Sequence, residues 1–507
     1  GFALAVTFID AGNIGGGGFM TIKIDQEVAF LDYREKAPLT AHKNMYLNDQ
    51  GDVINNITLV GGQAAGVPGT VAGFWEAHQR FGQLPWKDLV QPAIELADKG
   101  FVPAPILVES IHSMEQRFEG KTNFNDYFNS ISSDSLFRQP ELANTLRRIA
   151  EFGADDFYRG ETAALIVQQM EKSNGLISLE DLDAYSAVWR APVRAGWRDY
   201  EIISAPPPSS GGFAIVQLLK MKDDLYELFE GVEHNSAQYI HLVAEMEKRV
   251  FADRAEYLGD PDFFDIDIDA LIDDDYLARR AAAVNPKAIS VLDSVNPGLE
   301  SPNTTHYSIV DQWGNAVSNT YTINWDYGSG VVVGGAGFLL NNEMDDFSAK
   351  PGTPNIYGVV GSVANEIQPG KRMLSSMSPT IVLKGGEVEM VLGTPGGSTI
   401  FTTVFQVITN ILDFGMSVEE AIGIARFHHQ LVPPDLITYS GFTIGQYLPK
   451  ATVADLLERG YRSEPHSFEY GDVQIIMRSG DSWIAASDPR DRGQSRVFEV
   501  TTKTRDR

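Results

Sequence analysis

The spacing of apolar residues changes from a helical to a strand-like pattern near residue 304, and this change limits the folds that the chain can adopt. Before that point, apolar residues recur at three- and four-residue spacing, which predicts helices over residues 72–81, 89–97, 106–118, 141–152 and 237–258. After it come short β-rich runs punctuated by glycine, which predict strands over residues 306–310, 316–323, 373–383 and 388–392. Helices are predicted again over residues 402–411 and 418–425. Runs of strands between blocks of helices favour an α+β fold in which helix layers cover two packed sheets.

Composition excludes several classes of protein. The 507 residues, 43% of them hydrophobic, suffice for a large packed core. A net charge of −28 argues against nucleic acid as a partner, because binding to its backbone needs clustered Lys and Arg. The absence of cysteine excludes disulfides, thiol catalysis and Cys-ligated metals. No apolar run approaches the ~20 residues of a membrane span, since the longest candidate, residues 331–340, is broken by glycines.

Five polar motifs follow one another from residue 303 onward, and each supplies groups that one acyl-transfer reaction needs. They are Asn303-Thr304-Thr305-His306-Tyr307-Ser308, Thr322-Ile323-Asn324, Asn341-Asn342-Glu343-Met344-Asp345-Asp346-Phe347, Ser375-Ser376 and Gly396-Gly397. A hydroxyl such as that of Thr304 is a poor nucleophile until a base takes its proton. If Thr304 is the first residue of a chain, its own α-amine, with a pKa of about 7.7–8.0, can act as that base. Taken alone, Thr304-Thr305 is more simply explained as the start of a β-strand, where threonine is favoured.

The order and spacing of these motifs resemble the γ-glutamyltranspeptidases, and the resemblance covers nearly the whole chain. It implies a four-layer αββα sandwich of the N-terminal-nucleophile hydrolase type. It also implies self-cleavage between Asn303 and Thr304: the Thr304 hydroxyl attacks the Asn303 carbonyl, the peptide becomes an ester, and water opens the ester. Residues 1–303 would then form an N-terminally truncated large subunit and residues 304–507 the small subunit, together making one fold.

The resemblance also implies a role for each residue at a matching position. Thr322 would hydrogen-bond the nucleophile, and the backbone N–H groups of Gly396 and Gly397 would hold the oxyanion. Thr322 and Asn324 are two residues apart and are expected on one face of a strand. A donor's α-ammonium and α-carboxylate both need partners, since burying an unpaired charge is costly. Asn324 would contact this head group, Glu343 and Asp346 its ammonium, and Arg34, Ser375 and Ser376 its carboxylate, while Tyr357 would lie on a loop that covers the pocket.

The implied reaction is γ-glutamyl transfer and hydrolysis through a γ-glutamyl ester of Thr304. Glutathione and other γ-glutamyl compounds would be the donors, and water, an amino acid or a dipeptide the acceptor; no metal or organic cofactor would be needed. The two subunits would stay together as a heterodimer. The chain opens with Gly1-Phe2-Ala3 and carries no signal peptide. Since the family normally has an export signal and a further N-terminal segment, we expect a missing start and a periplasmic or secreted protein.

Two alternatives stay open from the sequence. A glutaryl or cephalosporin acylase of the same fold would act on a substrate without an α-ammonium, which would leave Asp346 facing no positive partner. An uncleaved, inactive homologue would serve as a binding protein, although the intact nucleophile and glycine pair argue against it. Outside the context of the family, Arg34 would be a surface charge, Glu343 and Asp346 a solvated acidic turn, and each Ser or Gly pair an ordinary turn.

Other patterns are weaker. The glycines of residues 12–19 fail the spacing of a nucleotide-binding loop and predict close backbone contacts instead. Asp265, Asp267 and Asp269 lack the Gly and Glu that a calcium loop needs. His428-His429 is expected to be structural, and the loop of residues 206–212 to line or support the site. His306 lies two residues after Thr304 and is a competing candidate for the general base.

Overall fold

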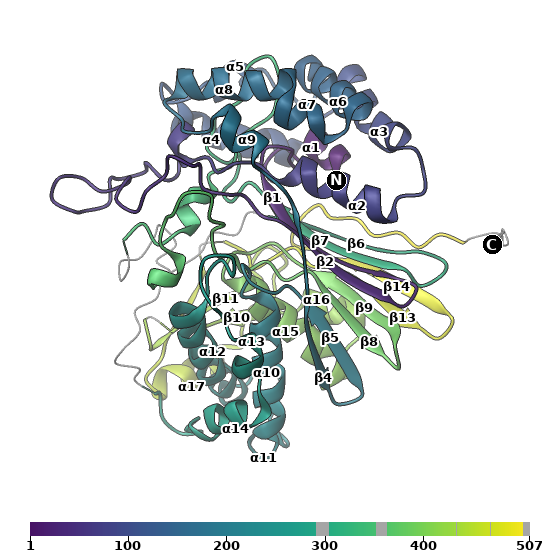
Figure 1. The fold of residues 1–507 in the computed structure, drawn as a ribbon. Helices are drawn as coiled ribbons and strands as arrows, with labels where there is room; N and C mark the ends of the chain where they lie inside the picture. Colours follow the sequence, from purple (N-terminus) through teal and green to yellow (C-terminus); the bar gives the residue numbers. More distant parts are fainter. Residues whose placement is uncertain (291–303, 351–361, 432, 467, 500–507) are drawn as a thin grey trace.

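The computed structural model describes residues 1–290, 304–350, 362–431, 433–466 and 468–499. Two antiparallel sheets pack face to face between two layers of helices, as Figure 1 shows, which confirms the predicted αββα sandwich. The first sheet has the order β3 (Val188–Arg190), β2 (Glu27–Tyr33), β1 (Gly17–Ile24), β7 (Ala316–Thr322) and β6 (Thr305–Val310). The second has the order β14 (Ser482–Ser487), β13 (Gln474–Ser479), β9 (Glu387–Gly393), β8 (Thr380–Lys384), β5 (Tyr200–Ser204) and β4 (Val193–Trp197).

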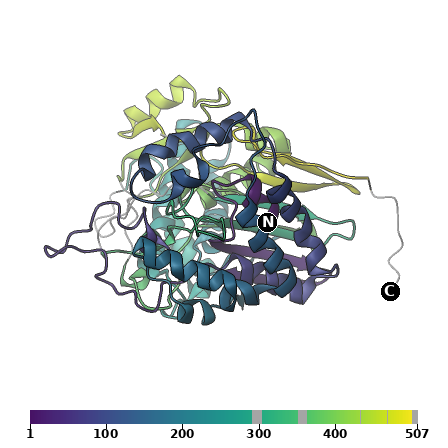
Figure 2. The same ribbon diagram turned by 90° about the horizontal axis from the view of Figure 1, so that it is seen from above.

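Helices from the first third of the chain cover the first sheet, and seen from above they lie across it (Figure 2). The apolar faces of most of these helices and the outer face of this sheet form one buried cluster. The helices of residues 105–118 and 124–128 instead pack in a second cluster with Ile323, Tyr327, Val332 and Leu339. The helices are α1 (Phe2–Thr7), α2 (Thr70–Phe81), α3 (Trp86–Lys99), α4 (Pro105–Phe118), α5 (Phe124–Phe128), α6 (Pro140–Phe152), α7 (Ala154–Arg159), α8 (Glu161–Ser173) and α9 (Leu179–Asp183).

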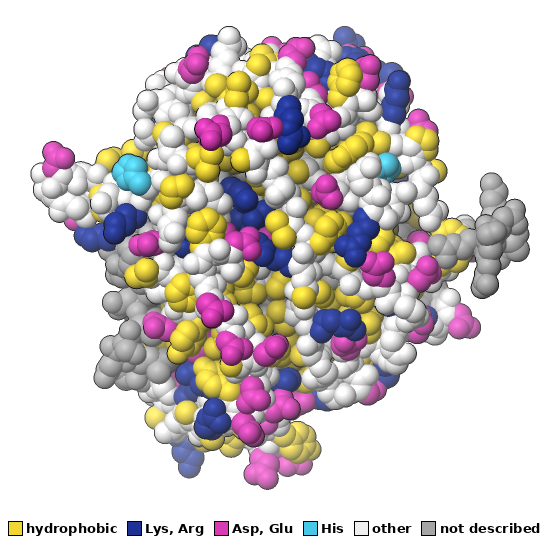
Figure 3. Space-filling model, viewed as in Figure 1, with side chains coloured by type: hydrophobic (Ala, Val, Ile, Leu, Met, Phe, Trp, Pro, Cys, Tyr) yellow, Lys and Arg dark blue, Asp and Glu magenta, His cyan; other side chains and the backbone are white. Residues whose placement is uncertain are grey.

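The second sheet is covered by a separate helix layer, with the long helix α12 (Ala237–Tyr257) in its core. The layer also holds α10 (Gly211–Asp224), α11 (Tyr226–Phe229), α13 (Ile268–Leu271), α14 (Asp274–Ala282), α15 (Thr399–Leu412), α16 (Val418–Gly423) and α17 (Lys450–Glu458). A small third sheet lies beside it, made of β10 (Arg426–His428), β11 (Leu436–Ser440) and β12 (Arg462–Pro465). Acidic side chains are spread over the face seen in Figure 3, in keeping with the net charge of −28.

Glycines allow the strands to approach closely where the first sheet begins. A Cβ on Gly16 would lie 2.0 Å from the carbonyl oxygen of Thr322, and one on Gly18 would lie 2.4 Å from that of Thr320. A side chain at either position would therefore displace the strand that ends at Thr322. The prediction of close backbone contacts for residues 12–19 is confirmed.

Two strand predictions were wrong at one end. The strand predicted over residues 373–383 begins only at Thr380, because Ser375 instead forms an isolated bridge to Ser209 in the loop of residues 206–212. The strand predicted over residues 316–323 ends at Thr322, because the backbone turns into the left-handed region at Asn324, with φ of 73°. No helix within the described ranges is long and apolar enough to cross a membrane.

Candidate functional site

One pocket gathers almost all of the predicted site residues at the end of the first sheet. Gly396 precedes the lining residue Gly397 but is not itself part of the lining, and Tyr357 lies outside the described residues. Met377 and Ile400 were not predicted and give the pocket an apolar wall. Its lining consists of Arg34, Thr304, Thr322, Asn324, Glu343, Asp346, Ser375, Ser376, Met377, Gly397 and Ile400.

Thr304 lies immediately before β6, and its side chain faces the end of β7. Its hydroxyl lies 3.4 Å from Thr322 Oγ1, and the backbone N–H of Asn324 donates to that same Oγ1 at 2.8 Å. Both threonines are more than nine-tenths buried. Asn324 lines the pocket from the turn after the strand, so the expectation that it shares a strand face with Thr322 was wrong. Asn303, on the other side of the predicted cleavage point, lies outside the described residues.

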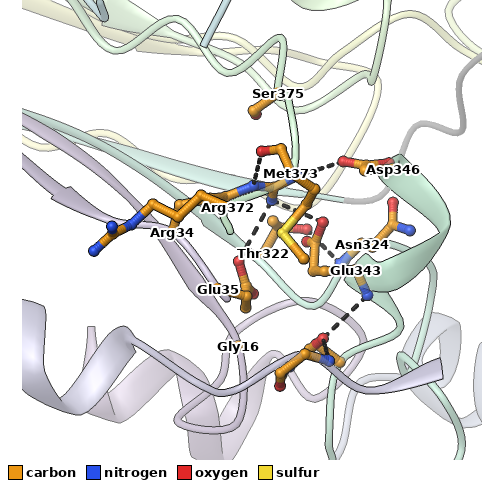
Figure 4. Close-up of polar contacts among 12 residues, drawn as sticks. Gly16, Arg34, Glu35, Thr322, Asn324, Glu343, Asp346, Arg372, Met373 and Ser375 are labelled. Carbon is orange, nitrogen blue, oxygen red and sulfur yellow. Dashed lines mark hydrogen bonds and ion pairs between the residues drawn. The ribbon is translucent and has the colours of Figure 1, made fainter. Parts of the chain in front are cut away.

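Arg34 follows β2 and is buried against carboxyl groups, as Figure 4 shows. Its Nη1 lies 2.7 Å from Glu343 Oε2 and 3.5 Å from Glu35 Oε2, and its Nη2 donates to Asp346. The 3-10 turn η2 (Glu343–Asp346) brings both acids to this side. Arg34 therefore already pairs with the two acids that were predicted to bind an ammonium group.

The carboxyl groups around Arg34 have shifted pKa values. Burial raises the pKa of Glu35 to about 8, although the Arg34 charge opposes the shift. Burial raises the pKa of Glu343 well above its usual range, again against Arg34, while Glu35 and Asp346 add to the increase. Glu35 and Glu343 are fully buried and share one guanidinium, so this pair retains a proton near neutral pH.

The acidic turn is tied to the first sheet by the side chain of Asn341. Its Nδ2 donates to the carbonyls of Gly15 and Gly66 at 2.9 and 2.8 Å, and its Oδ1 accepts the backbone N–H of Glu343 at 3.0 Å. A buried amide with all of these partners fixes the turn relative to the glycine-rich start of β1. The sequence analysis named Asn341 only as the first residue of its motif and predicted no role for it.

Ser375 and Ser376 are held by the loop of residues 206–212. Ser375 exchanges backbone hydrogen bonds of 2.8 Å with Pro208 and Ser210. Ser376 Oγ accepts from Arg254 Nη2 at 3.2 Å, and Ser210 Oγ donates to it at 3.4 Å. The loop thus supports the two serines from behind, as expected from the sequence.

Gly396 and Gly397 form the turn between β9 and α15, with φ of 137° and 56°. Their carbonyls accept from the backbone N–H groups of Thr399 and Ile400, which begin the helix. Among the described residues, neither glycine N–H has a hydrogen-bond acceptor. Gly397 lines the same pocket as Thr304, and unpaired N–H groups in such a turn can hold an oxyanion.

His306 forms no hydrogen bond with Thr304, the predicted nucleophile, within the described residues. Its Nδ1 lies 2.8 Å from Thr320 Oγ1, its Nε2 lies 3.0 Å from Ser308 Oγ, and Ser308 donates in turn to the Gln474 carbonyl at 3.3 Å. Burial lowers the pKa of His306 to about 3, so the ring is neutral at ordinary pH. Both ring nitrogens are used within the sheets, which argues against His306 as the general base for Thr304.

The other histidine and aspartate patterns have no ligand-binding geometry. His428 lies 3.0 Å from both Thr402 Oγ1 and Gln430 Oε1, and His429 Nδ1 lies 2.6 Å from the Leu436 carbonyl. Both are buried in the second helix layer, in agreement with a structural role. Within the described part of the chain, no group of three or more His, Cys, Asp or Glu residues could hold a metal ion.

Glu35 is the charged site residue that the sequence analysis missed. It is fully buried beside Arg34, and its Oε1 has no hydrogen-bond partner. The sequence signal that could have identified it was its position next to Arg34, which was predicted to bind the donor's carboxylate. Nothing in the local pattern distinguishes it from an exposed Glu, because its burial depends on segments far along the chain.

Comparisons with known proteins agree over the whole length of the chain. The Gamma-glutamyltranspeptidase family model matches residues 1–498. The glutathione hydrolase proenzyme of Pseudomonas aeruginosa is 56% identical over 500 residues, which cover 98% of this chain and 89% of that protein. The solved structure of a γ-glutamyltranspeptidase from Pseudomonas nitroreducens, complexed with L-DON, is 55% identical, with a TM-score of 0.56 over 57% of this chain and 87% of that one.

A cephalosporin acylase from Bacillus halodurans has a TM-score of 0.82 and covers 99% of this chain and 90% of its own, at 23% identity. At that identity, the similarity shows a shared fold and nothing about the reaction. The family model and the relative from Pseudomonas aeruginosa each match this chain over nearly all of its residues. The chain belongs to the γ-glutamyltranspeptidase family.

Proposed function

We propose that this chain is a glutathione hydrolase and γ-glutamyltransferase that activates itself by cleavage between Asn303 and Thr304. The large piece would be residues 1–303 and the small piece residues 304–507, held together as a heterodimer. Family membership supports the activity, and a pocket that contains a hydroxyl, a paired arginine and a glycine turn supports the mechanism. A periplasmic or secreted location is proposed from the same membership.

The observation that supports a γ-glutamyl donor is the balance of charge in the pocket. Arg34 faces the carboxyl groups of Glu35, Glu343 and Asp346, so the site has an excess of negative charge. A γ-glutamyl donor brings an ammonium to Glu343 and Asp346, while its carboxylate pairs with Arg34. A glutaryl donor would bring another carboxylate and no cation, which a buried site disfavours. This argues against the acylase alternative.

The proposed cycle uses only groups of this chain. The free α-amine of Thr304 takes the proton of its own hydroxyl, and Oγ1 attacks the γ-carbonyl carbon of the donor. The N–H groups of Gly396 and Gly397 stabilise the oxyanion. The amine returns the proton to the leaving nitrogen, and a γ-glutamyl ester of Thr304 remains. Water or an acceptor amine then attacks this ester and restores the hydroxyl.

Thr304→Ala tests the proposal directly. The variant should remain one polypeptide without activity, because alanine has no oxygen for the acyl shift. Intact-mass analysis and denaturing electrophoresis would measure this, and Thr304→Ser, which keeps a hydroxyl, should still yield two fragments. Two fragments from Thr304→Ala would contradict the assignment, and a wild-type protein that stays in one piece would support the alternative of an uncleaved binding protein.

A further inference from the structure

Asp32 lies in β2, two residues before Arg34, and is fully buried among charged groups. Its Oδ1 accepts the backbone N–H of Arg34 at 2.9 Å. Its Oδ2 accepts Nε of Arg190, from β3, at 2.7 Å and lies 3.4 Å from Nε of Arg372. One carboxylate therefore contacts arginines from three segments that are far apart in the sequence.

Arg372 begins the segment that completes the pocket on the side of the two serines. Its backbone N–H donates to Asp260 Oδ2 at 2.7 Å. The next two carbonyls, of Met373 and Leu374, lie 3.4 and 3.5 Å from the Nε and Nη2 donors of Arg34, and Figure 4 shows Arg34, Arg372 and Met373 side by side. Ser375 and Ser376 follow directly and line the pocket. The position of this segment thus depends on where Arg372 is held.

We infer that Asp32 is a positioning residue for donor recognition, which holds Arg34 through its backbone and the segment after Arg372 through its side chain. This inference rests on the proposed function. If it is correct, Asp32 sets the distance between Arg34 and the two serines, and so the geometry in which the pocket meets a donor's α-carboxylate. The donor's ammonium, which would lie near Asp346, does not depend on it.

The buried charges explain why an amide cannot replace this carboxylate. Arg190 and Arg372 are both largely buried, and Asp32 compensates both. An asparagine would be neutral, and its NH2 group cannot accept a hydrogen bond. Either the backbone N–H of Arg34 or Nε of Arg190 would then face an NH2 group. Both guanidiniums would also lose the buried negative charge that Asp32 supplies, although Asp262 stays near them. The two walls of the pocket would shift relative to each other while the nucleophile stays in place.

Asp32→Asn should therefore change donor selectivity rather than turnover in general. We would compare an L-γ-glutamyl anilide with a 4-aminobutanoyl anilide, which lacks only the α-carboxylate. The ratio of their kcat/KM values should fall by about tenfold or more, which corresponds to about 1.4 kcal/mol, mainly through a higher KM for the γ-glutamyl anilide. An equal loss on both donors would mean that Asp32 acts only on the fold, and the inference would be wrong.

Asp262→Asn is the matched control. Asp262 lies 2.8 Å from the same Arg190 and 3.6 Å from Arg372, but its side chain is 48% exposed. No hydrogen bond or ion pair joins it to Arg34 or the serines within the described residues. The control should keep the wild-type ratio, and a fall as large as that of Asp32→Asn would show that the loss of any negative charge beside Arg190 and Arg372 has this effect, which would overturn the inference.

If Asp32→Asn does not fold, Arg372→Gln removes the side chain through which Asp32 is inferred to hold the segment before the serines, and it should lower the same ratio. An unchanged ratio in that variant would contradict the role of Asp32. A failure of the proposed function looks different, because the wild-type protein itself would then show no turnover of, or no preference for, the γ-glutamyl anilide.

Discussion

At the scale of single residues, the donor pocket holds ion pairs of its own. Arg34 contacts Asp346 and lies 2.7 Å from Glu343, so the group expected to bind a carboxylate is paired with those expected to bind an ammonium. Binding of a zwitterionic donor exchanges one set of ion pairs for another. The free energy of binding is the difference between the two sets, which favours a ligand that supplies both charges over one that supplies a single charge.

Asp346→Ala should show this dependence on both charges. A γ-glutamyl donor would keep its carboxylate partner and lose an ammonium partner, which should cost about 2–5 kcal/mol in kcat/KM. A glutaryl anilide has no ammonium and should lose much less. Steady-state kinetics with both anilides would measure the difference. Equal losses would mean that Asp346 only holds Arg34 in place.

His306→Gln should leave the acidic limb of the pH–rate profile in place. The α-amine of Thr304 must be unprotonated to act as a base, so activity should fall as the pH drops below about 7–8. The pKa of His306 is lowered to about 3, so the imidazole stays neutral throughout this range and cannot produce the limb. The kcat/KM profile of the variant should have the same midpoint at a reduced amplitude. Loss of the limb would transfer the role of base to His306.

At the scale of elements, the surroundings of Thr304, the proposed nucleophile, depend on how closely β1 approaches the end of β7. Gly16 packs against the Thr322 carbonyl, and the side chain of Thr322 faces the Thr304 hydroxyl. The contact is between backbones, so neither side can yield by changing a rotamer. The glycine-rich start of β1 therefore fixes one wall of the pocket, even though no atom of Gly16 lines it.

Gly16→Ala should destabilise the protein and reduce activity together. Its Cβ would lie 2.0 Å from the Thr322 oxygen, and overpacking of this kind costs about 1–3 kcal/mol or more. Thermal unfolding and kinetics would measure both effects. Gly196→Ala in β4 is the control, because nothing lies within 4 Å of its added Cβ. A Gly16 variant as stable as the control would show that the strands can separate freely.

The helices and strands also show how much of the fold the sequence could predict. Periodicity predicted α2, α4, α6 and α12 to within two residues at each end. The first three bury mainly one face, whereas α12 is buried on nearly all sides and was predicted from the spacing of its apolar residues alone. Periodicity failed for residues 373–379, since Ser375 and Ser376 bond to a loop more than 160 positions earlier in the chain. The motifs predicted the pocket residues. They could not predict that Arg34 pairs with Asp346, 312 positions away, because a pattern of residues does not record which charges meet.

At the scale of the whole molecule, both sheets combine strands from the two sides of the proposed cleavage point. In the first sheet β1, β2 and β3 precede residue 304, whereas β6 and β7 follow it. In the second, β4 and β5 precede it, and β8, β9, β13 and β14 follow it. Separating the two pieces would break the β1–β7 and β5–β8 ladders and expose both cores.

The cleaved protein should therefore behave as one particle. Gel filtration without denaturant should give a single species that contains both fragments, and a denaturing gel of that species should show two bands. The fragments should separate only at a denaturant concentration that also abolishes the circular dichroism of the sheets. Separation under milder conditions would contradict the shared-sheet arrangement.

The shared sheets also affect how the protein can be made. While the chain is intact, its covalent connection holds β1 near β7 and β5 near β8 at an effective concentration far above that of separate molecules. Two pieces synthesised independently would lack that advantage, and each would expose strand edges that can pair with the wrong chain. The connection is thus needed during folding, and the cut removes it only after the ladders have formed. A fragment such as residues 304–507, expressed by itself, is expected to aggregate rather than to wait in a folded state for its partner.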